Sequence, residues 1–184
     1  MSARVALLRA VNVGGRNRIP MVELRAALEA AGLRDVSIVL QSGNVVFDAS
    51  GGEAAAATEI RSAIAEAFGL DVGVTVRTAA EMRRIVGANP FLADGEPRDA
   101  VTLHVAFLDA QPAAATTAIL DPDRSPPDAF EVRGREVYLC YPGGSGRSRL
   151  TLGYLEQTLR VQGTARNWRT VERLASMLDA RGGD

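Results

Sequence analysis

The strongest constraint on the fold is the order in which strand-like and helix-like segments follow one another. Short apolar runs indicate strands, and apolar residues spaced three and four apart indicate helices. In the first half, the expected strands are 4–9, 36–40, 44–48 and 72–77, and the expected helices are 21–31 and 53–68. This is the β-α-β-β-α-β order of a ferredoxin-like unit.

The same order returns in the second half without strong sequence identity to the first. There the expected strands are 100–108, 130–133, 136–141 and 163–167, and the expected helices are 112–120 and 150–161. One extra helix follows each unit. The first extra helix begins at Thr78 and Glu81, which have the spacing of a capping box, and the second spans 168–180.

Each unit is expected to form an antiparallel sheet of order 4-1-3-2, with both helices on one face. The strands are apolar on both faces, as in Val5–Leu8, so the second face must also be covered by the other half, the extra helices or a second subunit. We expect an α+β fold, an α/β sandwich of two consecutive ferredoxin-like units plus extra helices, packed into one compact body. The expected domains are residues 1–91 and 92–184, with the polar segment 92–98 as linker.

Composition limits the chemistry. The 21 basic residues are all arginine, so a Schiff base and a P-loop lysine are excluded. With one cysteine, Cys140, and one histidine, His104, the chain cannot form an internal disulfide or a His-rich or Cys-only metal site, and we expect no metal and no cofactor. Both residues fall in strands, and His104 is interpreted as a core or interface residue.

The formal net charge of −1 gives no general attraction to nucleic acid or to an anionic membrane. No run of residues has the length of a membrane span, and the first residues lack the layout of a signal peptide. We therefore expect a cytoplasmic protein with no membrane association. The sequence leaves open whether it is a monomer or a homodimer.

The first candidate site is the loop between the first strand and the first helix. In this topology the loop lies at the same sheet edge as the hairpin between strands two and three. Glycines allow close backbone approach, arginines supply forked donors, and a helix N-terminus points free N–H groups at the same place. These features suit a small anionic ligand. The predicted ligand-binding residues are Arg9, Asn12, Gly14, Gly15, Arg16, Asn17, Arg18, Gln41, Ser42, Gly43 and Asn44. The alternative is that they only shape the turn.

The second candidate is a Gly/Ser/Arg loop at 142–149, which meets neither the P-loop pattern nor the G-x-S-x-G pattern. Strand direction places it at one edge with the corner at 166–169, so the arginines there could share a basic pocket. The predicted secondary anion site comprises Ser145, Gly146, Arg147, Ser148, Arg149, Arg166, Asn167 and Arg169. Asn167 is also a natural N-cap, and Trp168 is interpreted as a packing residue.

Long motifs in this chain resemble a bacterial family known as domain of unknown function 1697. The motifs are Leu7–Met21, Gln41–Phe47, Asn89–Phe91, Gly146–Ser148 and Thr164–Trp168. The resemblance implies a duplicated ferredoxin-like architecture and no assigned activity. The family usually has lysine and then a Thr-Asn-Asn-like run after Gly-Arg-Ser. In this chain the corresponding segment contains Arg149, Thr151, Leu152 and Gly153 instead. A role for the family's asparagines therefore does not carry over to this chain.

Three functions follow from these observations. The favoured one is binding of a small phosphate- or carboxylate-bearing ligand at the first candidate site. The second is a nucleic-acid-binding protein that uses arginine clusters on a ferredoxin-like scaffold, although the aromatic residues do not match the RNP1 pattern. The third is an enzyme, for which the sequence names no reaction and no catalytic residue.

Overall fold

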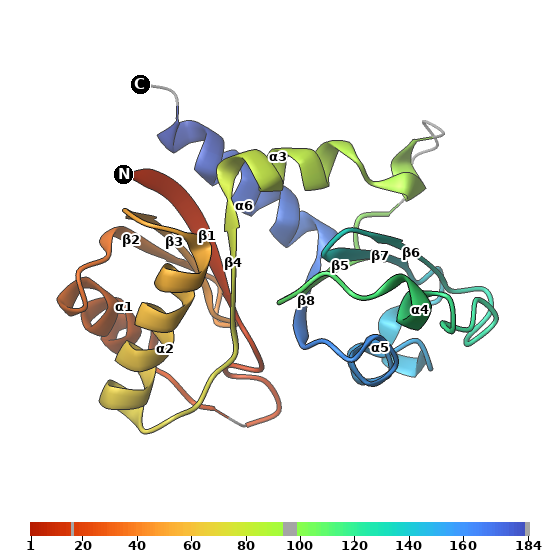
Figure 1. Ribbon diagram of the computed structural model, residues 1–184, viewed down its shortest axis with the longest axis horizontal. Coiled ribbons are helices and arrows are strands. Elements are labelled where there is room, and N and C mark those ends of the chain that lie inside the picture. The colour runs from red at the N-terminus through yellow and green to blue at the C-terminus, as the bar shows by residue number, and fades with distance from the viewer. Residues whose placement is uncertain (16, 94–98, 183–184) are drawn as a thin grey trace. The chain divides into compact units, whose positions relative to one another are not determined.

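The computed structural model describes residues 1–15, 17–93 and 99–182. Two compact units make up the fold (Figure 1). The first contains residues 1–83 together with the chain from Leu174 onward, and the second contains Arg84–Arg173. Each unit carries one four-stranded antiparallel sheet, so the α+β class predicted from the sequence is confirmed.

The first unit has the predicted element order. Its elements are β1 (Ser2–Leu8), α1 (Met21–Ala30), β2 (Arg34–Val39), β3 (Asn44–Ala49), α2 (Glu53–Phe68), β4 (Val74–Thr78) and the beginning of α3 (Ala79–Gly87). The sheet order is β2-β3-β1-β4, with every neighbouring pair antiparallel. This is the predicted 4-1-3-2 order, and it places β1 at the centre.

The first sheet is buried on both faces. Helices α1 and α2 lie side by side on one face (Figure 1), where Leu28 and Ile60 pack with Leu8 in a single apolar core. On the opposite face Val5 and Leu7 are also fully buried. Side chains alternate between the two faces of a strand, so burial at every position of β1 from Arg4 onward requires both faces to be covered.

The second unit repeats this order. Its elements are the end of α3, η1 (Pro90–Leu92), β5 (Leu103–Leu108), α4 (Ala114–Thr117), β6 (Ala129–Arg133), β7 (Glu136–Cys140), η2 (Ser145–Arg147), α5 (Leu152–Leu159), β8 (Gly163–Asn167) and the beginning of α6 (Trp168–Arg181). The sheet order β6-β7-β5-β8 is equivalent to that of the first sheet, and β5 is central.

Two expected elements are shorter in the structure. Helix α4 spans four residues rather than 112–120, because the segment is rich in alanine and threonine and offers few large side chains to bury. Strand β5 begins at Leu103 rather than at residue 100, because a turn precedes it in which Thr102 donates to the Asp99 carbonyl. Most of the expected linker, residues 94–98, lies outside the described residues.

A local cap begins the first extra helix, α3, whereas long-range contacts hold the end of the second extra helix, α6. The Thr78 hydroxyl accepts from the Glu81 amide, and the Glu81 carboxylate accepts from the Thr78 N–H, which is a reciprocal capping box. At the other end of the chain, Arg181 donates to the Ser37 hydroxyl at 2.8 Å and lies 3.8 Å from the Asp48 carboxylate. The end of α6 is thus tied to the first sheet.

Candidate functional site

Asn12 is the central residue of the loop between β1 and α1. Its side-chain amide donates to the Ile19 carbonyl and to the Gln41 carbonyl, each at 3.0 Å. Its side-chain oxygen accepts from the Ile19 N–H at 2.9 Å. One side chain therefore joins three segments: the start of the loop, the end of the loop just before α1, and the hairpin between β2 and β3. The predicted proximity of loop and hairpin is present in the structure.

The loop backbone uses conformations that glycine and asparagine adopt most readily. Among the described loop residues, five have positive φ, namely Ala10 (54°), Asn12 (54°), Gly14 (59°), Gly15 (76°) and Asn17 (46°), and four of the five are glycine or asparagine. The Asn17 carbonyl accepts from the Asn12 N–H, and the Asn17 side chain donates to the Ala10 carbonyl. The asparagines close the loop from within, which is the turn-shaping role that the sequence left as an alternative.

The hairpin residues are tightly packed against the end of β1. The Leu8 N–H donates to the Gly43 carbonyl at 2.9 Å, and a Cβ at position 43 would lie 2.9 Å from the Cβ of Leu8. Asn44 is fully buried, and its amide donates to the Val39 carbonyl and the Ser42 hydroxyl. Gly43 and Asn44 therefore have structural roles that leave them little contact with a ligand.

A pocket of 460 Å³ lies at the N-terminus of α1. We call it the loop pocket, and its lining residues are Asn12, Gly15, Arg18, Ile19 and Pro20. Three of these belong to the predicted site, whereas Ile19 and Pro20 carry no polar side chain that could have indicated them. Within the described part of the chain, the exposed side chain of Arg18 forms no ion pair and no hydrogen bond.

The other predicted residues that the structure describes do not line the loop pocket. The Arg9 N–H donates to the Gly73 carbonyl, so the Arg9 backbone extends the pairing of β1 with β4 by one residue. Gln41 contributes its carbonyl to the Asn12 network. Arg16 lies outside the described residues.

The secondary site has its residues at one edge of the second sheet, but their surroundings differ. β7 and β8 both end opposite the beginning of β5. Arg166 is only 8% exposed, and its guanidinium donates to the Thr164 hydroxyl and the Ala165 carbonyl. Burial lowers the pKa of Arg166 to about 10. A ligand at the surface could therefore contact the exposed Arg147 but not the buried Arg166.

The other residues of this edge make local contacts. Arg169 lies 3.5 Å from the Asp99 carboxylate. The Asn167 side chain accepts from the Arg169 N–H, the N-capping role predicted from the sequence, and Trp168 is buried. The Arg149 N–H donates to the Ser125 hydroxyl, which also lies 3.5 Å from the Ser148 hydroxyl. Ser145 and Gly146 belong to the exposed turn η2.

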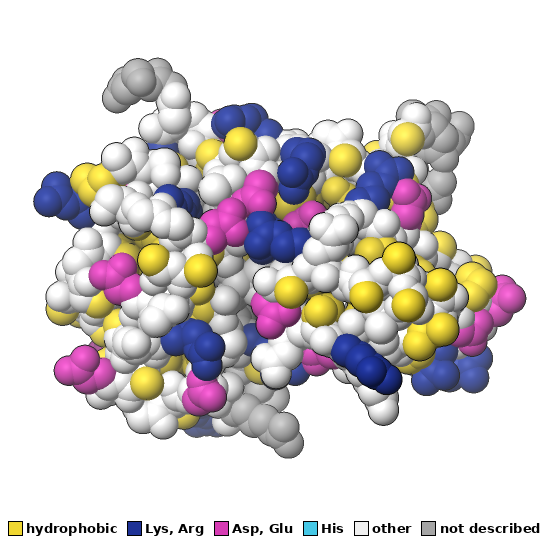
Figure 2. All heavy atoms as spheres, viewed as in Figure 1, with side chains coloured by type: hydrophobic (Ala, Val, Ile, Leu, Met, Phe, Trp, Pro, Cys, Tyr) yellow, Lys and Arg dark blue, Asp and Glu magenta, His cyan; other side chains and the backbone are white. Residues whose placement is uncertain are grey.

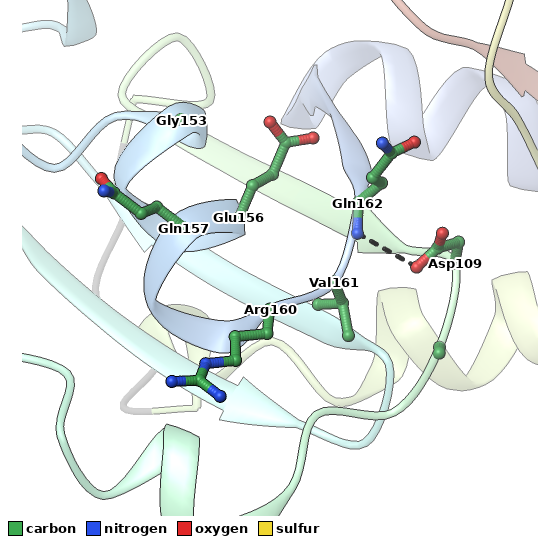
Figure 3. A pocket seen from close by; sticks show the side chains of 8 residues that line it. Asp109, Gly153, Glu156, Gln157, Arg160, Val161 and Gln162 are labelled. Atoms are coloured by element: carbon green, nitrogen blue, oxygen red, sulfur yellow. Dashed lines mark hydrogen bonds between the residues drawn. The ribbon is translucent and has the colours of Figure 1, made fainter.

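A second pocket, of 640 Å³, lies between the ends of β5 and α5 and was not predicted (Figure 3). Its carboxylates already have partners: Asp109 accepts from the Gln162 N–H at 3.2 Å, and Glu156 accepts from the Gly163 N–H at 2.9 Å. Arg160 points away from Asp109 in Figure 3. Since these acids cap the start of β8, we assign the pocket a structural role.

His104 packs against Tyr141, with ring centroids 5.3 Å apart and the rings nearly perpendicular. Its Nδ1 atom is buried and has no hydrogen-bond partner among the residues that the structure describes. Burial lowers the pKa of His104, against a smaller raising effect from the backbone of Thr102. No group of three metal-ligating side chains occurs within 1–15, 17–93 and 99–182, and no helix there is long and apolar enough to span a bilayer.

The two sheets and the loop pocket define the class: an α+β protein with two four-stranded antiparallel sheets of equivalent strand order. A family model described as "Protein of unknown function (DUF1697)" matches residues 1–138, and the chain belongs to this family. Its fold is similar to that of the conserved bacterial protein SP0830 from Streptococcus pneumoniae, with a TM-score of 0.74 and 19% sequence identity. The match covers 97% of this chain and 99% of that chain. No curated protein matches this chain.

Proposed function

We propose that this protein binds a small anionic ligand, bearing a phosphate or a carboxylate, in the loop pocket. The observation that carries the proposal is the Asn12 network, which fixes the pocket walls before any ligand arrives. A wall that is already ordered does not have to lose conformational freedom on binding. The predicted residues Asn17 and Gln41 support the loop through their hydrogen bonds to Asn12 and, from the Asn17 side chain, to Ala10.

Two features supply attraction for an anion. The Arg18 guanidinium lines the pocket and has no protein partner in the described part of the chain. Pro20 is the N-cap of α1 and its side chain gives no cap, so the N–H groups of the first turn of the helix are not satisfied by an N-cap side chain. An anion there would accept from these N–H groups and gain from the helix dipole.

Titration with inorganic phosphate, followed by amide NMR shifts, tests the proposal. We expect the shifts to concentrate at Asn12, Gly15 and the first turn of α1. Arg18→Ala should weaken binding roughly tenfold, since it removes a charge-assisted hydrogen bond worth about 1.5 kcal/mol at an exposed site. Arg25→Ala is the matched control, because Arg25 is an exposed arginine on the helix that follows, α1, where it is paired with Glu29 and does not line the pocket.

The outcome that would overturn the proposal is equal behaviour of the Arg18→Ala and Arg25→Ala variants, or no saturable shift in the wild-type protein. Added sodium chloride should weaken binding in the wild type, because a surface charge pair is screened by salt.

The nucleic-acid alternative has less support. Strand aromatics that could stack on bases are buried: Phe47, Phe107, Tyr138 and Tyr141 are at most 5% exposed. On the face seen in Figure 2, basic and acidic side chains are interspersed. Salt-dependent binding of single-stranded RNA that survives Arg18→Ala would favour this alternative.

A further inference from the structure

We infer that the ligand of the loop pocket is an amphiphilic anion, in which the phosphate or carboxylate head group is joined to an aliphatic chain. This inference rests on the proposed function and names its ligand class. Its basis is a set of large apolar side chains that remain in water on the chain segments next to residues of the loop pocket and of the Asn12 network: Val13 is 58% exposed, Val22 is 83% exposed and Leu40 is 51% exposed. Single exposed apolar residues are ordinary, but several at one site indicate a binding surface.

The Asn12 network places these three side chains at one edge of the unit. Val13 directly follows Asn12. Leu40 directly precedes Gln41, whose carbonyl accepts from the Asn12 amide. Val22 is in the first turn of α1, three residues after Ile19, the other partner of Asn12. The three aliphatic residues therefore belong to the three chain segments that the Asn12 hydrogen bonds bring together beside the pocket.

Leu40 is unfavourable for folding on two grounds. Its φ is 64°, a conformation that disfavours leucine and suits asparagine or glycine. Its side chain is also half exposed, so burial in the core does not compensate for this conformation. A strained and exposed leucine beside the Asn12 hydrogen-bond network points to a contact made with something outside the chain.

The combined chemistry selects the ligand class. Arg18 and the N-terminus of α1 suit an anionic head group, and a volume of 460 Å³ leaves room beside that group for the first part of an attached chain. The remaining chain would then lie over Val13, Val22 and Leu40. Inorganic phosphate or a purely polar metabolite would leave these three side chains in water. An alkyl chain would remove apolar surface from water both on the protein and on the ligand.

A chain-length series tests the inference. Inorganic phosphate, methyl phosphate, butyl phosphate and hexyl phosphate are titrated against the wild-type protein, Arg18→Ala, Leu40→Asn and Ile119→Asn. We expect affinity to rise roughly two- to fourfold per methylene, the range for partial to full burial of a CH₂ group. Leu40→Asn should reduce this gain but keep the affinity for inorganic phosphate, and asparagine suits the backbone at position 40.

Ile119→Asn is the matched control, because Ile119 is an exposed aliphatic residue, 66% exposed, in the second unit. This variant should behave as the wild type with every compound. Equal affinity for all four phosphates, with Arg18-dependent binding retained, would overturn the inference and leave the proposed function standing. No binding of any of the four would overturn the proposed function itself.

The source of the amphiphile is distinguished by sedimentation with vesicles. Vesicles of phosphatidylglycerol and phosphatidylcholine are compared with vesicles of phosphatidylcholine alone. Sedimentation only with the anionic vesicles, lost in both Arg18→Ala and Leu40→Asn, supports a lipid head group within a bilayer. Binding of hexyl phosphate without vesicle sedimentation supports a soluble amphiphile. Vesicle binding that neither variant reduces, with no chain-length gain, contradicts the inference.

Discussion

Replacing Asn12 removes three hydrogen bonds from the loop, which lie between 2.9 and 3.0 Å in length. Each is worth about 1 kcal/mol net, and water can replace part of this at a half-buried site, so we expect a loss of about 2 kcal/mol in unfolding free energy for Asn12→Gly. Asn12→Ala should cost about 1 kcal/mol more, because the φ of 54° disfavours alanine.

Urea unfolding and amide exchange of Ile19 measure these effects. The Ile19 N–H donates to Asn12, so its protection should fall in both variants. Asn17→Gly is the matched control: Asn17 also has a positive φ, but its side chain donates only one hydrogen bond among those described, of 3.2 Å to the Ala10 carbonyl. It should cost about 0.5 kcal/mol. The reasoning is refuted if Asn12→Gly destabilises the protein no more than Asn17→Gly.

Gly43→Ala should destabilise the protein by about 3 kcal/mol, because φ at this position is 73° and the new Cβ would lie 2.9 Å from the Cβ of Leu8. The measurement is the Tm, which should fall; an unchanged Tm would contradict the prediction. Thr78→Ala should cost about 1 kcal/mol by loss of the capping box with Glu81, and a cost no greater than that of a surface Thr→Ala change would argue against it. Burial raises the pKa of Tyr141 to about 12, so the neutral form is favoured in the folded protein. The free energy of unfolding that Tyr141 contributes is therefore full below pH 10 and is lost as the pH rises to about 12. Urea unfolding of Tyr141→Phe should show a smaller loss of unfolding free energy over this pH range than the wild type. The same loss in both proteins would refute the prediction.

Much of the fold could be predicted because local signals and global order agree. Helix α2 begins and ends at the predicted residues, since glycines flank it on both sides and Gly69 adopts the left-handed conformation that ends helices. Strand β8 also has its predicted bounds. Helix α4 was overestimated because its alanines and threonines carry little periodic apolar signal.

The candidate site was predicted less completely, for reasons of side-chain direction. Topology placed the loop beside the hairpin, and the structure joins them through Asn12. Residue type could not tell that Asn44 faces inward to Val39, or that Arg166 is buried beside Thr164. Polar and basic residues are usually exposed, so their burial depends on tertiary partners that no local pattern reveals.

The attachment of Arg181 to Ser37 has a consequence for how the protein is made. The first unit includes the chain from Leu174 onward, so its segments are separated in sequence by the whole second unit. A ribosome releases all four strands of the first sheet long before it releases Arg181. The first unit therefore reaches its final form only after the whole second unit and Arg181 have been synthesised, and a fragment of residues 1–91 would lack the partner of Ser37 and Asp48.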